Sequence, residues 1–137
     1  MINSRSLSDL NPKVAAMCSE FINRCKAQHI DILITSTYRD AESQNALYAQ
    51  GRTTEGKKVT NAKGGQSFHN WKVAFDFVPI VNGKPNWSDV ALYTKCGEIA
   101  ESVGLEWAGR WKKFPEQAHC QFTNGLSLAD FQAGKTI

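Results

Sequence analysis

Two histidines and one aspartate, His69, Asp76 and His119, place the strongest constraint on how this chain can fold. Two imidazoles and one carboxylate make an open zinc site when they meet, because three protein ligands leave a fourth position for water. Seven residues span ~23 Å in a continuous strand and ~10 Å in a helix. If the three residues share a site, the chain must therefore bend around residues 70–72 and return to the same place at residue 119.

Residues 73–78 carry the clearest strand pattern in the chain. Val73, Phe75 and Phe77 alternate with Ala74 and Asp76, so a strand here would turn its large apolar side chains toward the core. Asp76 would then lie on the opposite face, where a carboxylate is available for chemistry. Further strands are expected at residues 30–34, 105–107 and 118–122.

Four segments have helical patterns. Apolar residues at helical spacing follow Asn11-Pro12, and proline suits the first turn of a helix. Asp40 is a candidate N-cap for a second helix, and Asn86 or Ser88 for a third that Gly104 ends. The expected helices cover about residues 12–25, 40–50, 86–103 and 126–133. Between the second and third, residues 52–66 form a long polar loop of the kind that often borders a functional cleft.

Motifs around the two histidines recur in one known enzyme family. They are Ser67-x-His69 followed by Ala74-x-Asp76, then Glu116-x-x-His119; a block of Tyr38-Arg39, Gln44, Leu47-Tyr48 and Gly51-Arg52; and Gly104-Leu105-Glu106-Trp107 with Gly109 and Trp111. In this order the motifs resemble the zinc D,D-peptidase family of bacterial cell-wall enzymes. The last block resembles the branch of L-alanyl-D-glutamate endopeptidases that phages use as endolysins.

The resemblance implies a zinc centre with two further catalytic residues. His69, Asp76 and His119 would hold Zn²⁺, which polarises a carbonyl and activates water. Glu116 would be the general base for the attacking water. Arg39 would stabilise negative charge on the reacting carbon or hold a substrate carboxylate.

Three more residues are candidates for substrate binding: Ser67, Gln44 and Trp107. Ser67 and Gln44 would hydrogen-bond substrate or support the metal ligands, or else have purely local roles. Trp107 would form a cleft wall together with Trp111, although large aromatic residues also commonly complete a core. Arg39 has its own alternative, a structural ion pair with a neighbouring carboxylate such as Asp40 or Glu42.

The chain departs from the family pattern at two places. Lys72 stands where relatives commonly have glycine, so a bend that needs a positive φ angle would be costly there. Ala108-Gly109-Arg110 stands where many relatives have Gly-Gly-Asp, which changes the expected polarity of the cleft near Arg110. Neither position is a candidate ligand.

The implied fold is α+β: one small domain over residues 1–137, with a central antiparallel sheet and flanking helices, as in D,D-peptidases and Hedgehog signalling domains. No separate cell-wall-binding domain is expected. The implied function is zinc-dependent cleavage of the L-alanyl-D-glutamate bond in a peptidoglycan stem peptide, leading to host cell lysis. The alternatives are a D-alanyl-D-alanine carboxypeptidase or dipeptidase, and a non-catalytic zinc-binding interaction domain.

Composition excludes several other classes of protein. With 42% apolar and 21% charged residues, a soluble monomer is expected, and no run approaches the ~20 apolar residues of a membrane span. The N-terminus has no apolar signal region, so the protein would stay in the host cytoplasm until a holin-type lesion admits it to the wall. A net charge of +3 without a recognition motif gives no support for nucleic-acid binding.

The four cysteines are expected to be small buried hydrophobes. Cys18 and Cys25 lie two helical turns apart, beyond disulfide reach, and Cys96 has the same interpretation. Cys120 follows His119 directly, but adjacent side chains in a strand point to opposite faces. Cys120 is therefore not expected to bind the metal.

Overall fold

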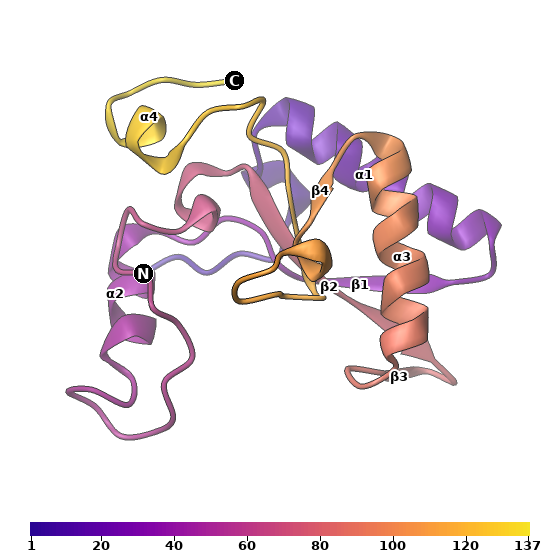
Figure 1. Cartoon of the computed structure of the whole chain (residues 1–137), viewed down its shortest axis with the longest axis horizontal. Coiled ribbons are helices and arrows are strands. Elements are labelled where there is room, and N and C mark those ends of the chain that lie inside the picture. Colours follow the sequence, from indigo (N-terminus) through magenta and orange to yellow (C-terminus); the bar gives the residue numbers. More distant parts are fainter.

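The computed structural model describes all of residues 1–137, and Figure 1 shows its helices arranged around one small sheet. The α-helices are α1 (Pro12–Ala27), α2 (Ala41–Ala49), α3 (Val90–Val103) and α4 (Leu128–Gln132). The strands are β1 (Asp31–Ser36), β2 (Ala74–Val81), β3 (Lys84–Pro85), β4 (Glu106–Trp107) and β5 (His119–Gln121). Short 3-10 helices are η1 (Leu7–Asp9), η2 (Phe68–Trp71) and η3 (Ala108–Arg110).

The sheet is antiparallel throughout and has the strand order β1-β2-β5-β4, with β3 paired to β2. The α+β fold with a central antiparallel sheet is thus confirmed. The strand β2 is central and its register matters most, because Asp76 pairs with Ser36 of β1 on one side and with His119 of β5 on the other. Directly paired residues in antiparallel strands project from the same face. The register alone therefore brings Asp76 and His119 together.

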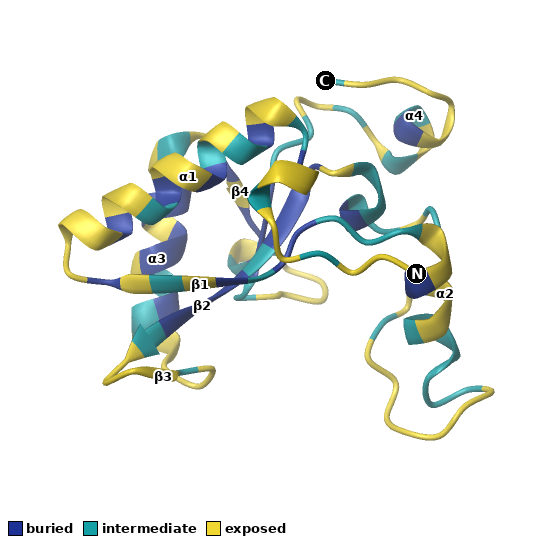
Figure 2. Cartoon of the chain, turned by 180° about the vertical axis from the view of Figure 1, so that it is seen from behind, coloured by how far each residue is buried: buried dark blue, intermediate teal, exposed yellow.

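The other face of β2 forms the hydrophobic core. Val73, Phe75 and Phe77 are fully buried there, as the alternation predicts, and the ring of Phe21 from α1 lies 5.8 Å from that of Phe75 and 5.0 Å from that of Phe77. Tyr93 of α3 closes the same cluster. Figure 2 shows the buried residues concentrated where α1, α3 and β2 meet. The core thus occupies one side of the sheet and leaves the Asp76 side open.

The helix ends follow the expected capping chemistry with one correction. Asn11 and Asp40 cap α1 and α2, each accepting a backbone N–H bond through its side chain, and Gly104 ends α3 with φ 103°. Neither Asn86 nor Ser88 caps α3. Asp89 does so, accepting from the backbone of Leu92. Asn86 instead accepts from the backbone N–H groups of residues 88 and 89 and shapes the turn before the helix.

The bend expected between His69 and Asp76 is formed by η2 and the residue that follows it. Ser67 is the N-cap of η2. Lys72, which follows the last residue of η2, lies in the left-handed region at φ 64°. Asn70 anchors this turn, since its side-chain amide donates to the carbonyl of Arg39 at 2.8 Å and its oxygen accepts from the backbone of Gly65 and Ser67. The chain therefore turns sharply at Lys72, where the family resemblance implies a glycine.

All four cysteines are free and buried, as expected. Cys120 points into the core, away from His119. Residues 52–66 contain no helix or strand, only an isolated bridge between Gln50 and Thr54. None of the helices has the length and apolar character needed to span a membrane.

Candidate metal centre

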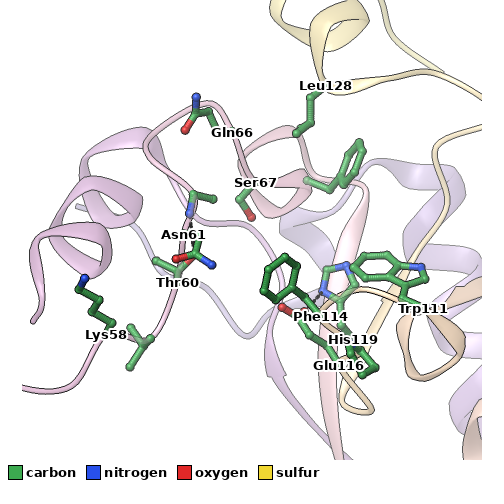
Figure 3. A pocket seen from close by; sticks show the side chains of 14 residues that line it. Lys58, Thr60, Asn61, Gln66, Ser67, Trp111, Phe114, Glu116, His119 and Leu128 are labelled. Atoms are coloured by element: carbon green, nitrogen blue, oxygen red, sulfur yellow. Dashed lines mark hydrogen bonds and ion pairs between the residues drawn. The ribbon is translucent and has the colours of Figure 1, made fainter.

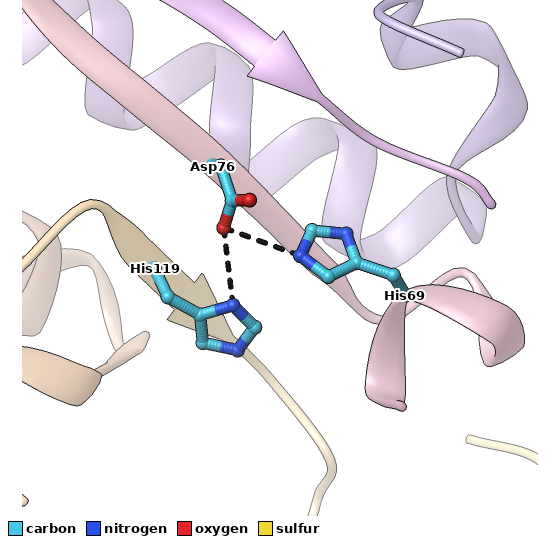
Figure 4. Close-up of side chains that lie close together, drawn as sticks. All are labelled: His69, Asp76 and His119. Atoms are coloured by element: carbon cyan, nitrogen blue, oxygen red, sulfur yellow. Dashed lines mark hydrogen bonds and ion pairs between the residues drawn. The ribbon is translucent and has the colours of Figure 1, made fainter. Parts of the chain in front are cut away.

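His69, Asp76 and His119 converge on one point, although they come from η2, β2 and β5. The Nε2 atom of His69 lies 3.2 Å from Oδ1 of Asp76, and Nδ1 of His119 lies 3.1 Å from the same oxygen (Figure 4). One potential ligand atom from each residue lies within 4.8 Å of the other two. The two imidazoles are buried and the carboxylate is partly open. Three protein ligands around a position that solvent can reach from one side form the arrangement of a catalytic zinc site.

Hydrogen bonds on the outer nitrogens fix how each imidazole faces this point. Nδ1 of His69 donates to the carbonyl oxygen of Thr37 at 2.9 Å. Nε2 of His119 lies 2.8 Å from Oε1 of Gln121, whose amide nitrogen faces Glu106 at 3.5 Å, so the Gln121 oxygen is the acceptor. The inner nitrogens of the neutral rings therefore carry lone pairs. Outer hydrogen bonds of this kind orient histidine ligands in metal sites.

This arrangement fits a cation. Two lone pairs directed at one carboxylate oxygen repel it unless a positive charge lies between them. Burial alone would raise the pKa of Asp76, but when the inner nitrogens carry protons, the charge of His69 and hydrogen bonds from both histidines hold that pKa well below its usual range. Burial alone would lower the pKa of His119, but its hydrogen bond and charge interaction with Asp76 raise that pKa. The site therefore favours a bound proton or metal ion in its centre.

Glu116 lies at the edge of the centre. Its Oε2 atom is 3.8 Å from Nδ1 of His119, and its side chain is 58% exposed. Two backbone bonds hold the turn that carries it: Glu116 N–H donates to Ala108 O at 3.1 Å, and His119 N–H to Glu116 O at 3.2 Å. A carboxylate so placed can reach a water between itself and the three ligands.

Arg39 is fixed in the same cleft from behind. Its Nη1 donates to Oε1 of Gln44 at 2.9 Å and its Nη2 to Oγ of Ser36 at 3.2 Å, while its buried Nε has no partner. Burial lowers the pKa of Arg39, and the charges of Asp76 and Glu116 partly restore it. No ion pair joins Arg39 to a neighbouring acid, since Asp40 instead caps α2. The guanidinium is thus oriented toward the charges of the centre.

The other candidate residues are distributed differently. Ser67 lines the cleft. Gln44 is fully buried: it accepts from Arg39 and donates to Ala62 O at 2.8 Å, so it positions the arginine and does not reach the cleft. Trp107 is only 6% exposed, and its Nε1 donates to Gln117 O at 2.8 Å.

Glycines make room for the buried Trp107 ring. A Cβ atom on Gly97 or Gly109 would collide with the indole, so this ring completes the core and Trp111 alone reaches the cleft. Arg110, the second departure from the family pattern, pairs with Glu101 of α3 at 2.8 Å and does not line the cleft. Its effect on the polarity of the cleft is therefore small.

The cleft consists of two grooves that share Glu116 and His119. One groove of about 640 Å³ runs between the loop at residues 58–68 and the segment 111–116 (Figure 3). A second of about 530 Å³ is lined by Arg39, Leu47 and Gln50. Glu116 and His119 line both grooves, whereas His69 and Asp76 line only the second, so the metal centre lies in the second groove, next to its junction with the first.

A comparison with protein families identifies the chain. The model of the VanY family, described as D-alanyl-D-alanine carboxypeptidase, matches residues 7–121. The chain belongs to the VanY family. Family membership makes it a peptidase.

Two curated relatives of this VanY-family chain have related names. It is 36% identical over 129 residues to the peptidoglycan L-alanyl-D-glutamate endopeptidase CwlK of Bacillus subtilis, covering 83% of this chain and 74% of that protein. It is 28% identical over 126 residues to the L-alanyl-D-glutamate peptidase of Listeria phage A118, covering 87% of this chain but only 41% of the phage protein.

Solved structures show the same fold at low identity. The L-Ala D-Glu endopeptidase ChiX of Serratia marcescens superposes with a TM-score of 0.66 at 16% identity, covering 95% of this chain and 92% of that one. DacB of Streptococcus pneumoniae D39 gives a TM-score of 0.62 at 20% identity, covering 93% of this chain and 78% of that one. These likenesses support the VanY-type fold.

Proposed function

We propose that this protein is a zinc-dependent peptidoglycan hydrolase that cleaves the L-alanyl-D-glutamate bond of the stem peptide. The observation that carries the proposal is the convergence of His69, Asp76 and His119 with outer hydrogen bonds that turn their ligand atoms inward. Zn²⁺ held by these residues would act as a Lewis acid and lower the pKa of a bound water to ~7. The donor set of two imidazoles and one carboxylate suits that ion.

Glu116 and Arg39 supply the rest of the chemistry. Glu116 accepts the proton of the attacking water and returns it to the leaving amine. Arg39 is held rigidly by Gln44 and Ser36 and faces the centre, so its positive charge is in place before negative charge develops on the substrate. Ser67, at the rim of both grooves, hydrogen-bonds the substrate.

Cleavage within a peptide is favoured over removal of a terminal residue. One groove contains the centre and the other adjoins it at Glu116 and His119, so a peptide chain has room to continue beyond the scissile bond. The names of the Bacillus and phage relatives point to the same bond. A D-alanyl-D-alanine carboxypeptidase, the activity that names the family, is the second candidate.

The proposed setting is host cell lysis by a phage endolysin. The protein would act as a monomer after a holin-type lesion in the membrane gives it access to the wall. The phage relative supports this setting.

Digestion of purified peptidoglycan tests the function. With Zn²⁺, new D-glutamate N-termini and L-alanine C-termini are expected by mass analysis, and a chelator should abolish them. Free D-alanine would instead indicate the carboxypeptidase. Zinc binding without any release would indicate the non-catalytic domain.

Glu116→Gln tests the assigned base. It should bind zinc and unfold at the temperature of the wild type, yet lose about 10²–10⁴-fold in kcat. Glu98→Gln, on an exposed site of α3 outside both grooves, is the matched control. If Glu116→Gln and Glu98→Gln had the same turnover, Glu116 would have no part in the mechanism.

A further inference from the structure

The larger groove beside the metal centre has two chemically different walls. One is apolar, with Trp111, Phe114 and Pro115. The other, formed by residues 58–68, carries the polar residues Asn61 and Gln66 among the apolar Val59, Ala62 and Phe68. Figure 3 shows the rings of Phe114 and Trp111 beside His119, with the polar side chains of the loop across the opening.

Phe114 is the most unusual residue of the apolar wall. Its side chain is 75% exposed, although large aromatic side chains are normally covered. Its backbone lies in the left-handed region at φ 51°, a conformation that is rare for a bulky residue and concentrates at binding sites. Trp111 beside it is held by a hydrogen bond from Nε1 to Glu106 at 2.7 Å, so the face of its ring is presented in one orientation.

The polar residues of the second wall present hydrogen-bond donors. Oδ1 of Asn61 accepts from Arg52 at 3.3 Å, and Oε1 of Gln66 accepts from the backbone of Lys63 at 3.0 Å. The side-chain amide oxygens are therefore used within the loop, while their NH₂ groups make no bond within the chain. Lys58 adds a positive charge at the outer end.

We propose that this groove binds the amino sugar to which the stem peptide is attached. The inference rests on the proposed function, because the alanine of the cleaved bond is itself linked to the muramic acid of the glycan. A residue spans at most ~3.6 Å, so the sugar must lie about one residue away from the scissile bond. The groove adjoins the metal centre, since Glu116 and His119 are among its lining residues.

A saccharide matches both walls. Its C–H face packs on aromatic rings, whereas its hydroxyl and acetamide oxygens accept hydrogen bonds from amide donors. The groove volume of about 640 Å³ lies in the range typical of ligand sites. Lys58 would meet the negative charges of the wall polymer. The enzyme then recognises glycan-linked stems in preference to free peptides.

Two substrates with the same stem peptide test the inference. One carries the disaccharide on its alanine, and the other has an acetyl group there instead. The wild type should hydrolyse the glycan-linked substrate with the higher kcat/KM. Phe114→Ala should lower the ratio of the two kcat/KM values about tenfold, as expected for the loss of one aromatic contact. Phe114→Tyr, which keeps the ring, should retain the ratio.

Trp87→Ala is the matched control, because Trp87 is 54% exposed but lies outside the groove. It should leave the ratio unchanged. Equal kcat/KM values for both substrates, or a Phe114→Ala ratio equal to that of wild type, would overturn the sugar site while the endopeptidase function stands. No hydrolysis of either substrate would overturn both.

Discussion

Replacing Lys72 by glycine and, separately, by alanine would measure what the bend between His69 and Asp76 costs the fold. Lys72 has φ 64° and an exposed side chain, and its Nζ lies 4.9 Å from the centre of the Tyr38 ring. Both substitutions remove this cation–π contact, which is worth about 0.5–1 kcal/mol at an exposed site. The difference between the two variants therefore isolates the backbone conformation.

The magnitude follows from two opposing effects. A left-handed conformation costs an L-residue about 1–2 kcal/mol, which glycine avoids. Glycine loses about 0.5–1 kcal/mol more than alanine through its freedom in the unfolded chain. We therefore expect Lys72→Gly to be about 0.5–1 kcal/mol more stable than Lys72→Ala, equivalent to about 2–4 °C in Tm for a domain of this size.

Chemical and thermal unfolding should be measured with a chelator and again with zinc. The chelator removes any contribution of metal binding, so the first comparison reports on the turn alone. A Lys72→Ala variant at least as stable as Lys72→Gly would refute the view that the left-handed backbone at this position carries a cost.

Three further changes test the centre and its support. Gln121→Leu removes the acceptor for Nε2 of His119 and should weaken zinc binding about 10–100-fold, measured by competition with a chromophoric chelator; unchanged affinity would exclude this orienting role. The pKa of His119 is raised, so protonated His119 stabilises the metal-free protein, and this stabilisation is lost as pH rises through the folded-state pKa of His119. The pKa of Asp76 is lowered, so the stabilisation from its ionised carboxylate is lost only as pH falls through the folded-state pKa of Asp76. The chelated protein should therefore be most stable at mildly acidic pH, and the rise in Tm on adding zinc should grow toward neutral pH; a rise independent of pH would contradict this assignment. Phe131→Ala removes a 3% exposed ring between η2 and α4 and should cost about 3–5 kcal/mol, measured by urea unfolding; a cost below 1 kcal/mol would show that α4 does not support η2.

The local patterns in the sequence were sufficient for the elements that carry the site. The alternation at residues 73–78 predicts both the core face of β2 and the position of Asp76 on the other face. The distance argument between His69 and Asp76 predicts a bend near Lys72, and the structure has it. The alternation depends only on spacing along the chain, whereas the bend follows from spacing once the family resemblance assigns His69 and Asp76 to one metal site.

Contacts between distant segments cannot be predicted from local sequence patterns. Thr37 and Gln121 orient the two histidines, yet no local pattern marks a backbone carbonyl 32 residues away or one glutamine among several as an acceptor. The sequence leaves Trp107 between a cleft wall and the core, and the structure places it in the core because glycines at positions 97 and 109 make room for its ring. The cap of α3 was misplaced because Asn86, Ser88 and Asp89 are all good caps within four residues.

The burial of every thiol has a consequence for handling the protein outside the cell. A thiolate is the reactive form of cysteine, and burial raises the pKa of Cys18 to about 12 and raises that of Cys120 as well. The raised pKa therefore protects Cys18 and Cys120 from disulfide exchange when the folded chain moves from a reducing to an oxidising solution. A thiol reagent reaches these sulfurs only when the core opens. The rate of cysteine alkylation therefore reports the rate of unfolding without an added label.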